Sequence, residues 1–92
     1  MFVVTRFRVD PAVRAEVAGH GAALLAVLEA LPGFRSGELG AAADDEGLLA
    51  LLTTWDGVGA YRRALGQAQV KIVGAPLWVH AVDEPGVYVS GE

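Results

Sequence analysis

The stretch that decides the fold is Leu48-Leu49-Ala50-Leu51-Leu52-Thr53-Thr54-Trp55, which runs directly into Asp56-Gly57-Val58-Gly59-Ala60-Tyr61. The first eight residues have the length of a strand, and an aspartate follows them in the position of a helix cap. Because residues 48–52 are apolar at every position, both faces of this strand must be covered. Helices of the same chain can cover one face, and a second subunit is the expected cover for the other.

Outward from this stretch, alternating apolar and polar positions and turn residues predict four strands in all. The predicted strands span residues 2–9, 34–43, 48–55 and 87–89. Gly37 and Gly40 interrupt the second of them and indicate bulges or close backbone approach. The acidic run 44–47 between the second and third strands is predicted to be a solvated hairpin loop.

Helices are predicted between these strands. Asp10 as a cap and Pro11 at the first helical position predict a helix that runs to about Ala30. Its inward stripe, at steps of three and four, contains Val13, Val17, His20, Leu24, Leu28 and Leu31. Asp56 is predicted to cap a second helix over residues 57–65. Residues 67–82 are predicted as two short helical turns, because Pro76 would break one long helix.

The resulting order, βαββαβ, predicts an α+β, ferredoxin-like fold. An antiparallel sheet would carry both helices on one face and leave the other face open. The whole chain, residues 1–92, is expected to form one domain of this kind. The open face is expected to pair with that of a second copy and give a homodimer.

Composition supports this assembly and excludes several classes of function. Hydrophobic residues make up 53% of the 92 residues, more than a domain this small easily buries alone. The net charge of −4 argues against nucleic acid and anionic membranes as partners. The chain has no cysteine, no apolar run long enough to span a bilayer, and a start that alternates like a strand rather than a signal peptide. A cytoplasmic protein without a bound metal is expected.

Four segments carry a resemblance to a known family. They are Val3-Val4-Thr5-Arg6-Phe7-Arg8-Val9, Leu31-Pro32-Gly33-Phe34-Arg35, Thr54-Trp55-Asp56-Gly57-Val58-Gly59-Ala60-Tyr61-Arg62 and Asp83-Glu84-Pro85-Gly86-Val87-Tyr88. Over nearly its whole length the chain resembles the antibiotic biosynthesis monooxygenase (ABM) domain family of the dimeric α+β barrel superfamily. The resemblance implies a homodimer with sheets packed face to face, and a pocket in each subunit between the sheet and the helices.

The resemblance also implies a function. Members include cofactor-free quinone-forming oxygenases, in which a Trp at the end of this strand and a Tyr six residues later line the pocket, as Trp55 and Tyr61 would here. Those enzymes add a strand asparagine, whereas this chain contains no asparagine and offers Leu51 and Thr53. Haem-degrading relatives use an Asn-Trp-His set, and with Leu65 in the histidine position haem degradation is disfavoured. The predicted function is a cofactor-independent monooxygenase acting on a small phenolic, quinol or polyketide-like aromatic substrate.

The predicted catalytic residues are His20 and Tyr61. A histidine inside an otherwise apolar helix stripe would serve as a general base near neutral pH, and the alternative is a partly exposed or backbone-bonded histidine. Tyr61 would act as a hydroxyl donor, and Trp55 would present its indole N–H beside it. If the pocket does not react, the chain is a non-catalytic dimeric module that binds a small molecule or regulates.

The remaining predicted substrate-binding residues are His80, Arg6, Leu51 and Thr53. His80 would join the pocket wall, or else lie at the surface or the interface. Arg6 shares a strand face with Arg8 and would either pair with a carboxylate, Glu38 or Asp83, or stabilise an anion in the pocket. Trp78 is predicted at the edge of the dimer.

Overall fold

The sheet of this protein has four antiparallel strands, seen in a computed structural model that describes residues 1–90. The strands are β1 (Phe2–Arg8), β2 (Phe34–Ala41), β3 (Leu48–Trp55) and β4 (Val87–Tyr88). They lie in the order β2-β3-β1-β4. The two central strands, β1 and β3, are therefore neighbours in the sheet although they are far apart in sequence. All four strands lie within their predicted ranges.

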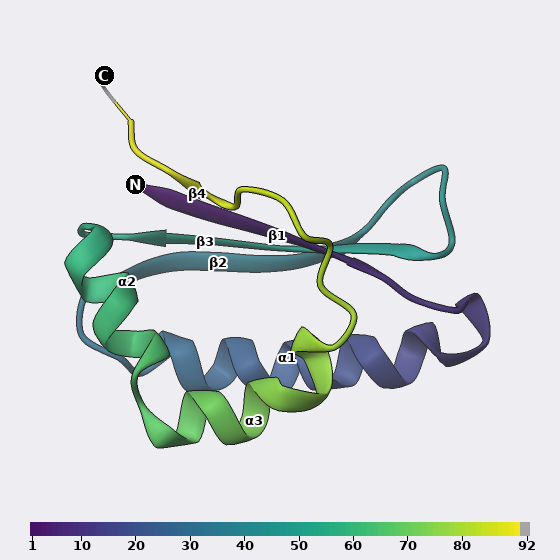
Figure 1. The fold of residues 1–92 in the computed structure, drawn as a ribbon, viewed down its shortest axis with the longest axis horizontal. Coiled ribbons are helices and arrows are strands. Elements are labelled where there is room, and N and C mark those ends of the chain that lie inside the picture. Colours follow the sequence, from purple (N-terminus) through teal and green to yellow (C-terminus); the bar gives the residue numbers. More distant parts are fainter. Residues whose placement is uncertain (91–92) are drawn as a thin grey trace.

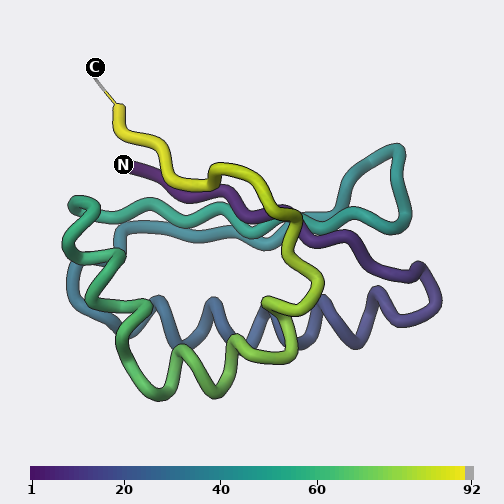
Figure 2. Tube along the Cα trace, viewed as in Figure 1, coloured from purple at the N-terminus to yellow at the C-terminus, as the bar shows by residue number. Residues whose placement is uncertain are grey.

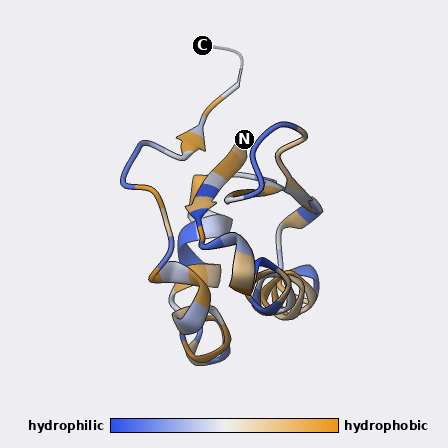
Figure 3. Cartoon of the chain, turned by 90° about the vertical axis from the view of Figure 1, so that its right-hand side faces the viewer, coloured by the Kyte–Doolittle hydropathy of each residue, from blue (hydrophilic) through white to orange (hydrophobic). Residues whose placement is uncertain are grey.

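The helices all cover one face of this sheet (Figures 1 and 3). A short 3₁₀ turn, η1 (Pro11–Val13), leads into α1 (Arg14–Glu29), and α2 (Val58–Leu65) and α3 (Ala68–Trp78) follow β3. This α+β, ferredoxin-like arrangement confirms the predicted fold class. No helix within residues 1–90 is both long and apolar enough to cross a membrane.

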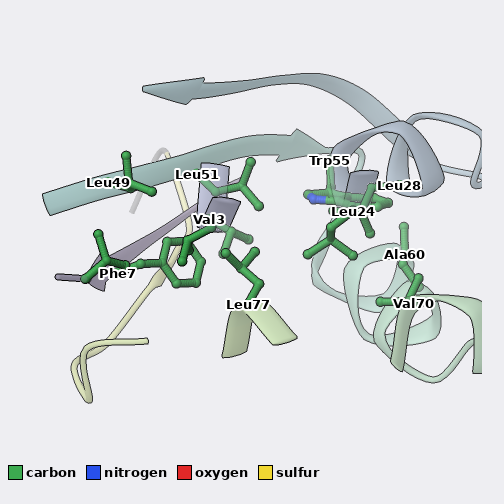
Figure 4. Packing of buried hydrophobic residues seen from close by; sticks show 13 residues of the cluster. Val3, Phe7, Leu24, Leu28, Leu49, Leu51, Trp55, Ala60, Val70 and Leu77 are labelled. Carbon is green, nitrogen blue, oxygen red and sulfur yellow. The ribbon is translucent and has the colours of Figure 1, made fainter. Parts of the chain in front are cut away.

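Strand register puts the core residues of β1 and β3 on the face below which the helices lie. Val3 is opposite Thr53 and Thr5 is opposite Leu51, and alternate residues of a strand point to the same face. The buried core joins these strands to all three α-helices (Figure 4). Its largest fully buried side chains are Trp55, Phe7, Leu24, Leu77 and Val70.

The segment after α2 differs from the prediction. Residues 68–78 form one helix, α3, with Pro76 inside its last three residues. A proline there removes the hydrogen bond to the carbonyl of Ile72, whose residue is 68% exposed, so that water can bond the carbonyl instead. From α3 the chain returns to the sheet, where Val82 and Arg6 share a backbone hydrogen bond (Figure 2).

Helix starts follow the predicted chemistry at one site and not at the other. Asp10 accepts a hydrogen bond from the backbone N–H of Ala12 at 2.9 Å, as an N-cap should, although the first turn is 3₁₀. At α2 the predicted cap, Asp56, is wrong because Gly57 holds the cap position without a side-chain bond. Asp56 instead uses its backbone N–H to bond the carbonyl of Gly33 at 2.8 Å.

Glycines in and before β2 mark tight packing. Gly33 has φ of +87°, a conformation that side-chain-bearing residues avoid. A Cβ at Gly37 would come within 2.5 Å of the Leu25 side chain, so side chains and not another backbone approach this glycine, while Gly40 has open space around it. The irregularity of β2 lies between Phe34 and Ser36 and not at either glycine.

The face of the sheet away from the helices is uncovered in the single chain. Leu49 and Leu51 of β3 are buried, but Leu52, which points the opposite way, is 39% exposed. Val87 and Tyr88 of β4 are also exposed. The apolar character on both sides of β3 therefore exceeds what one subunit covers.

Candidate functional site

A small enclosed cavity lies between the sheet and the helices, beside the segment that joins β3 to α2. Its volume is about 10 Å³, close to the minimum for one water molecule. The lining residues are Val3, Thr5, Leu28, Leu51, Thr53, Tyr61, Leu65 and Trp78. Polar groups reach an otherwise apolar wall only from two threonines, one tyrosine and one indole, so the site combines dryness with hydrogen bonding.

Thr53 and Trp55 build the sheet side of the site together. They are two residues apart on β3 and therefore point to the same face. The indole Nε1–H of Trp55 donates to the Thr53 hydroxyl at 3.0 Å, and Thr53 is only 3% exposed. Trp55 itself is buried beside the cavity rather than in its lining. Its ring packs edge-on against Phe34 and tilted against Tyr61, with centroids 5.2 and 5.8 Å apart.

Tyr61 supplies the helix side of the site. It lies in the second turn of α2 and is half-buried, and no group within residues 1–90 bonds its hydroxyl. Burial raises the pKa of the Tyr61 phenol above its ordinary value of 10.0. The hydroxyl is therefore protonated near neutral pH, and Tyr61 can donate a hydrogen bond to a ligand but cannot act as a phenolate base.

Two polar lining residues, Trp78 and Thr5, were not among the predicted site residues. Trp78 lies against Phe7, with ring centroids 6.1 Å apart, and lines the cavity rather than a dimer edge. Its position depends on α3 being one helix, since a break at Pro76 would have turned the indole elsewhere. Thr5 lines the cavity as well, and its alternation with Val3 and Phe7 on β1 was the available indication.

Neither predicted histidine lines this cavity. His20 is half-buried on α1, two turns before Leu28, or about 12 Å along the helix axis. His80 follows α3, and its carbonyl bonds the N–H of Arg8 at the opposite end of β1 from Phe2. Among residues 1–90 there is also no group of three His, Cys, Asp or Glu side chains arranged to hold a metal ion.

Arg6 lies outside the cavity, contrary to its predicted role in the pocket. It points to the uncovered face and forms two hydrogen bonds with the Glu84 carboxylate, at 2.6 and 2.7 Å. Arg8 pairs likewise with Asp45 at 2.7 Å, so the partners are neither Glu38 nor Asp83. Beside the Arg6 pair, an open groove of about 390 Å³ runs along Phe2, Val4, Pro85 and Tyr88. Both arginines therefore have a structural role, because each pairs with a carboxylate of its own chain.

The Arg6–Glu84 pair should make the free energy of unfolding depend on pH in the acidic range. Hydrogen bonds from Arg6 hold the pKa of Glu84 below its ordinary value of 4.5. A carboxylate with a lowered folded-state pKa stabilises the fold above its ordinary pKa, and this contribution disappears as the pH falls through the folded-state pKa. We expect Glu84→Gln to lose less stability than the unsubstituted protein between pH 6 and pH 3, measured by urea unfolding. Glu38→Gln, which removes an exposed carboxylate of β2, should keep the unsubstituted pH profile; equal profiles for all three proteins would contradict the prediction.

Solved structures with this fold include oxygenases. SnoaB, a cofactor-independent oxygenase from Streptomyces nogalater, is 25% identical and aligns over 99% of this chain and 92% of its own. The TM-score is 0.83 for SnoaB and 0.86 for a single-residue variant of it. In fold and in sequence, the chain is similar to the antibiotic biosynthesis monooxygenase family.

Further members of the ABM family extend the likeness. A putative antibiotic biosynthesis monooxygenase from Caulobacter crescentus is 25% identical over 91% of this chain and 80% of its own, with a TM-score of 0.78. One from Nitrosomonas europaea shares the fold at 12% identity, with a TM-score of 0.83 over 98% and 88% of the two chains. No family model and no curated protein matches the sequence.

Proposed function

We propose that this protein is a cofactor-independent monooxygenase acting on a small aromatic substrate of the phenol, quinol or anthrone type. The observation that carries the proposal is the pair of hydroxyls, Thr53 and Tyr61, in the wall of one otherwise apolar cavity. The ABM fold and the 25% identity to SnoaB support a reaction of this class.

The reaction requires a substrate that supplies its own electrons. A methylene between aromatic rings loses a proton, and the resulting enolate gives electrons to dioxygen. The peroxide formed at that carbon then loses water, so that R₂CH₂ and O₂ become R₂C=O and H₂O. A protonated Tyr61 stabilises the enolate oxygen by donating a hydrogen bond in a dry site. The protein thus contributes anion stabilisation and exclusion of water.

The substrate enters by displacing part of the helical wall. An aromatic ligand needs far more room than about 10 Å³. Val3, Leu51 and Thr53 of the sheet and Leu28 of α1 are buried, whereas Thr5 of β1 and Tyr61, Leu65 and Trp78 of α2 and α3 are half-buried. The wall that gives way is therefore the one formed by α2 and α3.

Tyr61→Phe should lower kcat for anthrone oxidation by about tenfold or more, because it removes one hydrogen bond to the developing anion. Oxygen uptake with anthrones and hydroquinones measures the rate. Tyr88→Phe is the matched control, since Tyr88 donates to the Pro85 carbonyl on the opposite face, and it should stay within about twofold of the unsubstituted rate. No oxygen uptake above buffer across the whole panel would refute the proposed function.

A second candidate function is a binding module without catalysis. It is favoured by the lining itself, in which none of the eight residues is a base that titrates near neutral pH. In that case the same ligands would bind without oxygen uptake. His20 was predicted to remove the substrate's proton, but it does not line the cavity. If catalysis does occur, the bound substrate must therefore be acidic enough to lose its proton without a protein base.

We also propose that the uncovered sheet face pairs with a second copy of this chain. Leu52 and the groove along Phe2 and Val4 give the face its apolar character. The arginines beside them, Arg6 and Arg8, are already paired within the chain, so burying these two side chains leaves neither arginine unpaired. A second copy supplies the same apolar face and the same neutral pairs.

A further inference from the structure

We infer that Thr53 is the group that contacts the ligand's oxygen from the sheet side, and that Trp55 acts through it as a positioning residue. This inference rests on the proposed function for the identity of the ligand, but its test detects binding alone. It changes the role of Trp55, which the sequence predicted to contact the substrate.

The direction of one hydrogen bond carries the argument. An indole nitrogen can only donate, so in the 3.0 Å contact the Trp55 Nε1–H gives its proton and the Thr53 hydroxyl accepts it. The hydroxyl proton of Thr53 then has to point elsewhere. Within residues 1–90 the indole is the one hydrogen-bond partner of this side chain, and Thr53 lines the cavity. A ligand in the cavity is therefore placed to receive that proton.

Burial explains why Trp55 cannot take this role itself. It is 1% exposed and is not among the lining residues. Its ring is held between Phe34 and Tyr61, which fixes the direction of the indole N–H. A fixed donor behind Thr53 occupies one acceptor position of the threonine oxygen, so the hydroxyl proton is kept away from the indole.

The polar side chains of the lining define the class of ligand oxygen. Thr53 from the sheet and Tyr61 from α2 carry hydroxyls able to donate to a ligand, and the other two polar residues, Thr5 and Trp78, are donors as well. Such a site favours an oxygen that only accepts, namely a phenolate, an enolate or a quinone carbonyl, over a neutral hydroxyl that must also donate. The substrate is thus held in its deprotonated form.

4-Nitrophenol and 4-nitrotoluene form a matched pair of probes, because they differ by a hydroxyl against a methyl group and the phenolate has its own visible absorbance. We expect the protein to lower the pKa of bound 4-nitrophenol. Thr53→Val should raise that bound pKa back by about one unit, a tenfold loss of preference for the anion, and Thr53→Ser should keep most of the preference. Affinity for 4-nitrotoluene should stay within about twofold in both variants.

Trp55→Phe tests the positioning role, since it keeps an aromatic ring and removes the N–H. It should weaken the preference for the anion by about threefold in the unsubstituted protein and have no effect on it when Thr53 is already Val. A bound pKa that Thr53→Val leaves unchanged, additive effects of the two substitutions, or binding of neither probe would overturn the inference. Oxygen uptake with an unchanged bound pKa would refute this role of Thr53 and support the proposed enzyme. A bound pKa that depends on Thr53, without oxygen uptake, would support the binding site and refute the enzyme.

Discussion

Replacing Gly33 with alanine should lower the free energy of unfolding by about 3 kcal/mol. Part of the loss comes from φ of +87°, which a residue with a Cβ adopts only at a cost of about 1–3 kcal/mol. The rest comes from overlap, because the added methyl group would occupy the place of the Ala60 side chain on α2. The Gly33 carbonyl also bonds the N–H of Asp56 at 2.8 Å, so neither chain segment can shift freely. Urea unfolding followed by tryptophan fluorescence measures the change.

Gly19→Ala provides the opposite control for the same chemical substitution. Gly19 lies inside α1, and a Cβ there would meet nothing within 4 Å. Alanine in an exposed helix interior should raise stability by about 0.5–1 kcal/mol. The argument fails if Gly33→Ala is as stable as the unsubstituted protein, or if both alanines change stability in the same direction.

Leu52→Arg should convert the proposed homodimer to a monomer, with the dissociation constant raised by about a hundredfold or more. The substitution replaces the apolar side chain with a large, strongly hydrated guanidinium, so the paired faces lose apolar contact even though Glu38 is there to pair with the new charge. Within its own chain it would face Glu38, the cross-strand neighbour of Leu52, so the sheet should remain folded. Sedimentation at micromolar concentration separates the two species.

Ile72→Arg is the matched control for this experiment. Ile72 is an apolar residue that is 68% exposed, but it lies on α3 and therefore on the other side of the molecule. This variant should keep the mass of the unsubstituted protein. A mass near 9.6 kDa for the unsubstituted protein would contradict the proposed homodimer.

The fold could be predicted because the strongest patterns in this chain are local. The run from Leu48 to Trp55 matches β3 residue for residue, and alternation in Phe2–Arg8 gives β1 and its inward face. α3 was missed because the cost of Pro76 was judged without knowing that Ile72 is exposed to water. Asp56 is likewise a residue type that often caps helices, but its backbone N–H bonds the Gly33 carbonyl and Gly57 takes the cap position.

The site was harder to predict because a sequence pattern fixes the face of a helix and not the position along it. His20 belongs to the inward stripe of α1, yet it is two turns away from Leu28 and the cavity. Arg6 was compatible with either face until the register with β3 was known. Leu51 and Thr53 were predicted to bind substrate and Tyr61 to be catalytic, and their position in the cavity lining is consistent with these roles without testing them.

The two ends of the strand order limit how copies of this chain can associate. β4 is only two residues long, and β2, at the other edge, carries exposed Arg35 and Glu38 and a break in register after Phe34. Short, charged and irregular edges do not recruit further strands, which is how many β-proteins avoid fibril-like stacking. Face-to-face pairing uses up its own surface when two copies meet, so growth would stop at a closed pair. We therefore expect copies that meet through this face to stop at a pair and not to polymerise through the sheet.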